Sequence, residues 1–233
     1  MATSIAAGRK IVVVAALARE LAPLRRGGNS SLDFVVTGEG VQNAERELAL
    51  KLNEVQPRAV LGVGFGGALS ASLEIGDLVV VSMIDGLIEI QPSETLLAAA
   101  QTLSMDRIKT GIAITVDEVV CEAAAKRRLA ARLSIAEPAV VDMESAVIAR
   151  ICAERRIPFL IVRAVSDLLD EDLPVDFNRC RNEGGRISSL KVIRAAAGRP
   201  GAVKGLLELQ RRSRLCADRL AEFVEEFAGV VEE

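Results

Sequence analysis

The stretch from Val140 to Asp167 constrains the fold more than any other part of the chain. It begins and ends with apolar runs rich in β-branched residues, and residues 145–155 between them have apolar side chains at helical spacing. A strand, a helix and a strand in this length are typical of a right-handed, parallel βαβ unit. Parallel strands end at the same edge of a sheet. We therefore expect Glu144 and Asp167 to face one cleft, on the edge where open α/β sheets bind ligands.

The rest of the chain continues this α/β pattern. Strands are predicted over residues 10–17, 33–37, 58–63, 78–84 and 111–116. Helices are predicted over residues 41–55, 94–103 and 121–133, with a short helical turn at residues 18–26. The 233 residues suffice for a single α/β domain, with a core over residues 10–170 and a helical extension over residues 171–233.

Composition excludes several classes of function. The chain has no His, so acid–base chemistry near neutral pH must come from carboxylates, Cys or Lys. It also lacks Trp and Tyr and has a net charge of −3, which argues against a nucleic-acid partner. The four cysteines are dispersed, which with no His predicts free thiols in a reducing cytoplasm rather than a zinc site. We expect no metal and no other cofactor.

Two segments each have one interpretation that involves a membrane and one that does not. The apolar run at residues 11–18 loosely resembles a signal peptide, but a first buried strand explains it equally well and is favoured. Residues 176–219 hold 11 Lys or Arg against four Asp or Glu, around predicted helices at residues 188–197 and 202–227. These helices either pack on the sheet with a solvated basic face or lie on an anionic membrane surface. The expected location is cytoplasmic, with contact to the inner membrane surface as the second option.

Three glycines, Gly62, Gly64 and Gly67, fit the spacing of a dinucleotide-binding loop after the strand at residues 58–63. However, only ten residues separate Gly67 from the next predicted strand, which is too short for a helical crossover. We favour a glycine loop that lets the backbone approach a ligand and offer N–H groups to it. A non-catalytic nucleoside- or dinucleotide-binding protein remains the alternative.

Five segments together resemble the superfamily of purine nucleoside phosphorylases and methylthioadenosine/S-adenosylhomocysteine nucleosidases. They are TGEGVQNA (residues 37–44), GFGGAL (64–69), IGDLVV (75–80), VDMESA (141–146) and RAVSD (163–167). The resemblance covers residues 10–170. Through the segment LPVDFNR (173–179) and the basic extension, the chain is most similar to the hopanoid-associated phosphorylases. This implies a three-layer α/β/α sandwich with a central mixed, partly barrel-like sheet, and a homodimer.

The resemblance also implies a reaction, cleavage of the N-glycosidic bond of an adenine nucleoside with a modified 5′ side. Adenosylhopane, a lipid-linked nucleoside, is the subfamily's candidate. Asp167 matches the residue that protonates the leaving base, and Ser166 the residue that orients it. Glu144 matches the acceptor for the ribose hydroxyls, with Met143 packed beside the sugar. Glu20 matches the glutamate that activates water; an ordinary solvated helix acid is the alternative.

The remaining candidate residues show where the chain departs from the family pattern. Gly64, Phe65 and Gly66 match positions near the sugar or phosphate, where a small polar residue is usual in place of Phe65. Val119 falls near the position where nucleosidases stack an aromatic ring on the base. The strand at residues 58–63 lacks the arginine of the phosphorylases. We therefore favour water as the attacking group, with phosphorolysis as the alternative.

Two charged residues have structural interpretations. Asp142 either contributes to the substrate site or caps the helix that follows it. Arg163 stands inside a buried apolar strand, so we expect it to pair with a carboxylate.

Overall fold

The computed structural model describes residues 9–85, 87, 90–133, 137–182 and 187–232. Among these residues, seven strands form one mixed sheet in the order β2-β1-β3-β6-β5-β4-β7. An additional pairing between β3 and β7 closes the five strands from β3 to β7 into a barrel, from which β1 and β2 extend. The strands are β1 (Ile11–Ala15), β2 (Leu32–Val36), β3 (Ala59–Ala68), β4 (Leu78–Ile84), β5 (Ile108–Thr115), β6 (Ala139–Asp142) and β7 (Phe159–Asp167).

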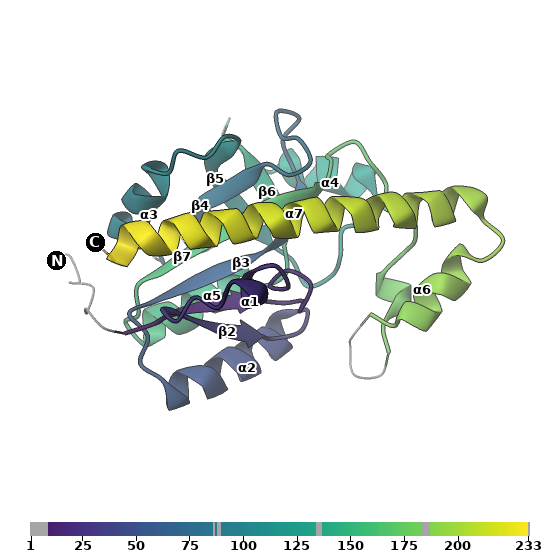
Figure 1. The fold of residues 1–233 in the computed structure, drawn as a ribbon. Coiled ribbons are helices and arrows are strands. Elements are labelled where there is room, and N and C mark those ends of the chain that lie inside the picture. The colour runs from purple at the N-terminus through teal and green to yellow at the C-terminus, as the bar shows by residue number, and fades with distance from the viewer. Residues whose placement is uncertain (1–8, 86, 88–89, 134–136, 183–186, 233) are drawn as a thin grey trace.

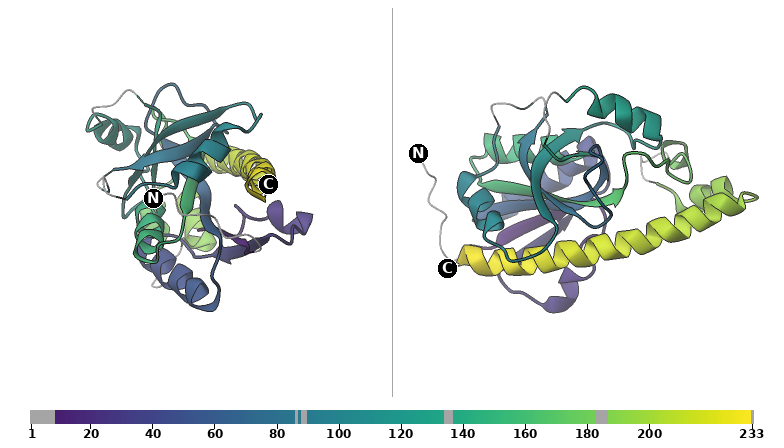
Figure 2. Two further views of the ribbon diagram at one scale, coloured as in Figure 1. Left: turned by 90° about the vertical axis from the view of Figure 1, so that its left-hand side faces the viewer. Right: turned by 90° about the horizontal axis from the view of Figure 1, so that it is seen from above.

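Helices cover both faces of this sheet, which gives the expected three layers (Figure 1). On one face lie α2 (Val41–Glu54) and α5 (Ser145–Glu154). On the other lie α1 (Leu24–Gly27), α3 (Glu94–Gln101) and α7 (Pro200–Glu232). A third, smaller apolar cluster lies beside α4 (Ala123–Ala130). The 3-10 helix η1 (Asn178–Cys180) and α6 (Ser189–Ala196) belong to the C-terminal extension, and α7 runs past the edge of the sheet, where α6 contacts it (Figure 2).

The alternation of side chains in β1 shows why these apolar runs form central strands. Ile11, Val13 and Ala15 point toward α7, whereas Val12 and Val14 point toward α2 and α5. All five are buried, since the strand has a helix layer on each side. The apolar run near the N-terminus is therefore this strand. Among the described residues, no helix is long and apolar enough to cross a membrane.

The glycines at residues 64–67 do not form a loop, so that prediction is wrong. They lie inside β3, which continues to Ala68 and pairs with both β6 and β7. A Cβ atom added at Gly67 would lie 2.9 Å from Asp167 Oδ2 and 3.2 Å from Val141 Cγ1. Because glycine has no side chain, β6 and β7 can pack closely against β3 at these positions. Because no helix begins at these glycines, the dinucleotide-loop interpretation is also wrong.

The predicted parallel pairing of β6 and β7 is wrong as well. β6 pairs antiparallel with β3 and parallel with β5, whereas β7 pairs parallel with β3. Gly67 is opposite Val141 in the pairing of β3 with β6 and opposite Asp167 in the pairing of β3 with β7. The end of β3, rather than a shared edge of parallel strands, therefore lies between the ends of β6 and β7. The mixed sheet implied by the family resemblance is confirmed.

Element boundaries differ more modestly. Residues 18–23 form turns, and helix α1 begins only at Leu24. β5 begins three residues earlier than predicted, at Ile108. The last helix extends from Pro200 to Glu232, because its buried stripe continues through Phe227, Ala228 and Val231. Arg186, one of the basic residues counted in the extension, lies outside the described residues.

Candidate active site

Glu20 lies in the turn after β1 and is 3% exposed. Its Oε2 accepts a hydrogen bond from the Leu17 N–H at 2.7 Å, and its Oε1 accepts one from the Phe65 N–H at 2.9 Å. Burial raises the pKa of Glu20, and these two N–H groups and Arg163 oppose that shift. The alternative of a solvated helix acid is therefore wrong, because the carboxylate is buried against β3.

Glu144 follows β6 and is 7% exposed. Its Oε1 accepts a hydrogen bond from the Gly40 N–H at 2.8 Å, and the neighbouring Met143 is also buried. Burial raises the pKa of Glu144 to about 7; Arg163 and the Gly40 N–H lower it, whereas the negative charges of Asp142 and Glu20 add to the increase. Glu144 is thus a carboxyl group that changes charge near neutral pH.

Arg163 is 1% exposed, and its charge interacts with the carboxylates of Asp142, Glu144 and Glu20. Its Nε lies 2.6 Å from Asp142 Oδ2, and its Nη2 donates to Ser145 Oγ at 3.0 Å. Asp142 Oδ1 accepts from the Ser145 N–H at 3.2 Å and from Thr115 Oγ1 at 2.9 Å. The expected pairing of Arg163 is confirmed, and Asp142 also contributes to capping α5. Both Asp142 oxygens are thus already bonded within the protein.

Asp167 ends β7 and is 7% exposed. Ser166 Oγ donates to its Oδ1 at 2.8 Å, as expected for an orienting residue. Its Oδ2 forms an ion pair with Lys126 of α4, a lysine with no exposed surface. Sequence reasoning missed Lys126, since it looks like any basic helix residue. The available signal was its position three residues after the buried Ala123, on the inner face of α4.

The aromatic and apolar candidates, Phe65 and Val119, are both partly buried. Phe65 is partly buried, and the guanidinium carbon of Arg19 lies 5.8 Å from the centre of its ring. The backbone of Val119 is paired in both directions with the side-chain amide of Asn178, at 3.0 and 2.9 Å. A base beside Val119 would therefore meet its side chain, because its N–H and C=O are already bonded.

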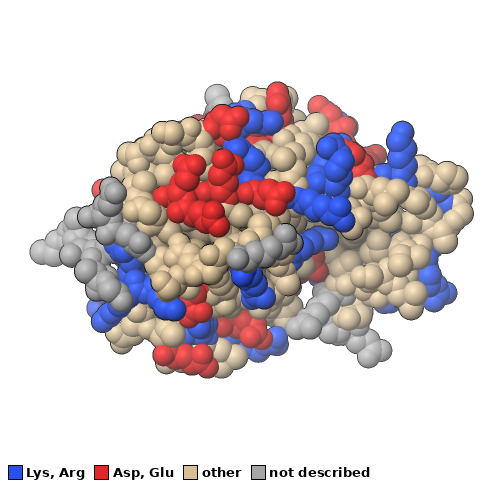
Figure 3. Space-filling view, in the orientation of Figure 1, with Lys and Arg blue, Asp and Glu red and all other residues tan. Residues whose placement is uncertain are grey.

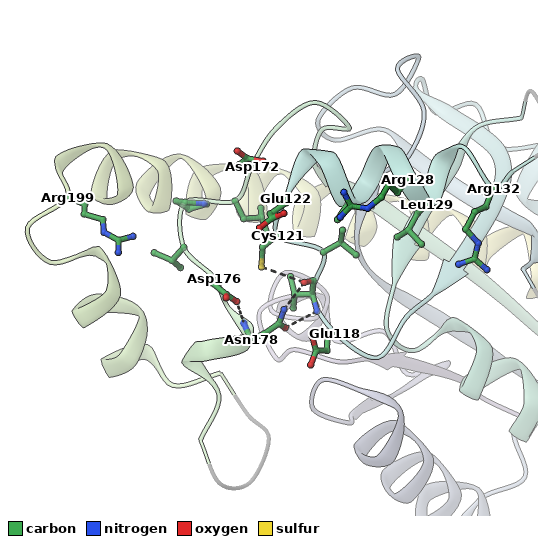
Figure 4. A pocket seen from close by; sticks show the side chains of 16 residues that line it. Glu118, Cys121, Glu122, Arg128, Leu129, Arg132, Asp172, Asp176, Asn178 and Arg199 are labelled. Carbon is green, nitrogen blue, oxygen red and sulfur yellow. Dashed lines mark hydrogen bonds between the residues drawn. The ribbon is translucent and has the colours of Figure 1, made fainter.

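A cavity of about 720 Å³ opens beside Val119, between α4, residues 172–178 and Arg199 (Figure 4). Its walls combine apolar side chains with Glu118, Asp176 and Arg128. A smaller cavity of about 70 Å³ lies between Asp167 and α7. Neither of these two cavities brings Glu144 and Asp167 together, so the shared cleft stays a prediction.

Taken together, Glu20 and Asp167 are buried against the glycines of β3 at residues 64–67, and the buried Glu144 is near enough to Glu20 and Arg163 for their charges to shift its pKa. Arg163 is the cation that interacts with Glu20 and Glu144, and Lys126 is the cation that pairs with Asp167. Carboxylates in such different settings are suited to separate acid and base roles.

Comparison with known proteins agrees with this geometry. The family model of the phosphorylase superfamily matches residues 34–208. The 5′-methylthioadenosine/S-adenosylhomocysteine nucleosidase of Shewanella sediminis is 28% identical over 185 residues, covering 69% of this chain and 80% of the relative.

Solved structures show the same fold. The corresponding nucleosidase of Helicobacter pylori superposes with a TM-score of 0.71 at 17% identity, over 96% of this chain and 99% of the other. The futalosine hydrolase of that organism gives a TM-score of 0.70 at 18% identity, over 95% of this chain and 97% of the other. Since the family model spans well over half of the residues, this chain is a member of the phosphorylase superfamily of enzymes.

Proposed function

We propose that this enzyme hydrolyses the N-glycosidic bond of an adenine nucleoside whose 5′ side is modified. The observation that carries the proposal is the set of three buried carboxylates, of which Glu20 and Asp167 lie against β3 and Glu144 accepts from the Gly40 N–H. Cleavage of a ribosyl–purine bond passes through an oxocarbenium-like sugar, and the departing purine needs a proton. Asp167 supplies that proton with Ser166 orienting it, Glu144 binds the ribose hydroxyls, and Glu20 activates water. The nucleosidase names of the relatives support the same reaction.

Water is the better nucleophile for this site on electrostatic grounds. One cation, Arg163, is surrounded by Asp142, Glu144 and Glu20, and its Nε is already paired. A phosphate dianion near these carboxylates would be repelled more than it is attracted. Gly64, Phe65 and Gly66 would line the sugar, with the Phe65 N–H held by Glu20 rather than free for an anion.

The decisive test is adenine release by the purified protein from adenosine, 5′-methylthioadenosine and S-adenosylhomocysteine, with and without phosphate. Hydrolysis predicts a rate independent of phosphate and a free sugar product, which is ribose from adenosine and the 5′-substituted ribose from the other two substrates. Release that requires phosphate and yields the corresponding sugar 1-phosphate would establish phosphorolysis instead. Tight nucleoside binding by calorimetry with no turnover of any of them would favour the non-catalytic alternative.

The finer substrate assignment is adenosylhopane, a nucleoside that carries a large apolar group on its 5′ side. The similarity of residues 173–179 to the hopanoid-associated phosphorylases motivates it. The cavity beside Val119 supports it, because its apolar side chains include Leu129, Leu173 and Pro174. A higher kcat/KM for adenosylhopane than for 5′-methylthioadenosine would agree with this assignment, and the reverse order would reject it. We also expect a homodimer, which light scattering in solution would measure.

The C-terminal extension supports contact with an anionic membrane surface. Leu190 and Ile193 of α6 are 66% and 64% exposed, and Leu207 of α7 is 62% exposed. Residues 187–207 contain four basic and no acidic residues. Figure 3 shows Asp and Glu gathered instead over the C-terminal half of α7. Exposed apolar side chains among basic ones match a negatively charged lipid surface.

Co-sedimentation with vesicles tests this contact. The protein should bind vesicles containing phosphatidylglycerol and not those of phosphatidylcholine alone. The double variant L190E/I193E should abolish binding, whereas L50E, at an exposed leucine of α2, should not change it. Equal binding by all three proteins would reject a membrane role for α6.

A further inference from the structure

Lys126 is the fully buried lysine of α4, and its three ammonium hydrogens have three acceptors. Nζ contacts Asp167 Oδ2, the carbonyl oxygen of Leu168 at 2.8 Å and that of Glu171 at 3.0 Å. An ammonium group has one hydrogen for each of these three acceptors, so the geometry fits the charged form of Lys126. In that form Asp167, which accepts from Lys126 on one oxygen and from Ser166 on the other, is the carboxylate of the ion pair.

This arrangement conflicts with a simple general acid, because the group that must give a proton to the base holds none. A buried ion pair is also a poor source of stability, since desolvation offsets its attraction. The second buried pair of the site, Arg163 with Asp142, differs in chemistry: a guanidinium does not release its proton in proteins, whereas a buried ammonium can.

We infer that Lys126 is a positioning residue for Asp167 and holds the proton that the leaving purine receives. This inference rests on the proposed function. The Lys126 ammonium passes a proton to the Asp167 carboxylate, and the carboxylic acid passes it to a ring nitrogen of the purine. As that N–H bond forms, the electrons of the breaking C–N bond move onto the purine. Water loses its proton to Glu20 as it attacks the sugar. After release, Glu20 gives that proton to solvent and the Lys126 amine regains a proton from solvent.

The surroundings of the pair fit a stored proton. Burial raises the pKa of the nearby Cys121 and Cys216 thiols, that of Cys216 to about 12, so neither competes as an acid near neutral pH. From α7, Arg212 binds Glu171 at 2.6 Å, which leaves that carboxylate occupied. Because Lys126 has no exposed surface, it exchanges its proton with solvent only through the Asp167 side or by local opening.

The test compares Lys126→Met and Lys126→Arg with the wild type in adenine release across pH 5–9. Arginine keeps the charge and the contact but cannot give up the proton. We expect both variants to lose about 100-fold or more in kcat with little change in KM. The methionine variant should regain activity toward acid pH, where solvent can supply the proton in place of Lys126. Arg127 is next to Lys126 on α4, and Arg127→Met, which removes a surface pair with Asp170, should stay within about twofold of wild type.

The outcomes separate the two claims. A Lys126→Arg enzyme with at least half of the wild-type kcat, or a Lys126→Met enzyme with the wild-type rate and pH profile, would overturn the role of Lys126 while the proposed function stands. A wild-type protein that releases no adenine would overturn the proposed function, and this role with it. If Lys126→Met does not fold, Lys126→Arg still decides, because it retains the buried charge.

Discussion

Arg163 and Asp142 lie on different strands, 21 residues apart in sequence, and form a buried ion pair with 2.6 Å between Nε and Oδ2. The Asp142 carboxylate also accepts hydrogen bonds from Ser145 and Thr115. The pair therefore joins β5, β6, β7 and the start of α5. It holds together the strands β6 and β7, at whose C-terminal ends Glu144 and Asp167 lie.

Removing one member of this pair should destabilise the protein strongly. Arg163→Met leaves Asp142 buried without its cation, which should lower the free energy of unfolding by about 3–5 kcal/mol. Urea denaturation measures the change. Arg150→Met is the matched control, because Arg150 pairs with Glu45 and Glu154 at the surface and should cost less than about 1 kcal/mol. Equal losses in both variants would contradict the structural role.

Gly64 is required because two charged groups lie against its Cα atom. A Cβ atom there would be 2.4 Å from Arg163 Nη1 and 3.2 Å from Glu20 Oε1. Gly64→Ala should cost about 1–3 kcal/mol in unfolding free energy and reduce activity, since Arg163 or Glu20 must move. Gly229→Ala in α7 meets nothing within 4 Å and should instead stabilise the helix by about 0.5–1 kcal/mol. A Gly64→Ala variant with the unfolding free energy and activity of wild type would show that Arg163 and Glu20 can move away from this position without cost.

Stability should fall as pH rises through the range in which Glu144 titrates. In the folded protein the pKa of Glu144 is about 7, against an ordinary value of 4.5. Between these values the native state keeps a proton that the unfolded chain has released, so unfolding becomes easier as pH increases. The stabilisation that Glu144 contributes is complete below about pH 4.5 and lost above about pH 7. Between these values the free energy of unfolding falls by roughly 1.4 kcal/mol per pH unit.

Glu144→Gln should remove that dependence. The difference in unfolding free energy between pH 5 and pH 7, measured in urea, should be about 2 kcal/mol smaller in the variant than in wild type. Glu20 shifts in the same direction and remains, so some dependence persists. Glu54→Gln, at the exposed end of α2, controls for the loss of one charge. An unchanged pH dependence would show that Glu144 is ionised throughout.

Asp167→Asn should reduce adenine release by about 100-fold to 10,000-fold, because an amide cannot transfer the proton. The amide still accepts a hydrogen bond from Ser166, so circular dichroism should show an intact fold. Asp170→Asn, three residues further on and exposed, should keep the wild-type rate. Turnover unaffected by Asp167→Asn would exclude Asp167 as the acid.

The sequence alone determined which residues are candidates for chemistry. Without His, carboxylates had to be considered, and the motifs ending at Glu144 and Asp167 identified them. The alternating apolar runs also located most strands and helices, since the burial of strands and helix faces is encoded locally. The family resemblance added the mixed sheet.

Only the tertiary structure decided how these residues meet. The glycines of residues 64–67 look like a loop locally, yet they lie in a strand because β6 and β7 pair with both sides of β3. Glu20 looks like a solvated acid until the Phe65 N–H is brought to it. Lys126 looks like a surface charge until β7 places Asp167 beside it. In each case the deciding contact joins residues 40 or more positions apart or depends on strand pairing, which local sequence patterns do not encode.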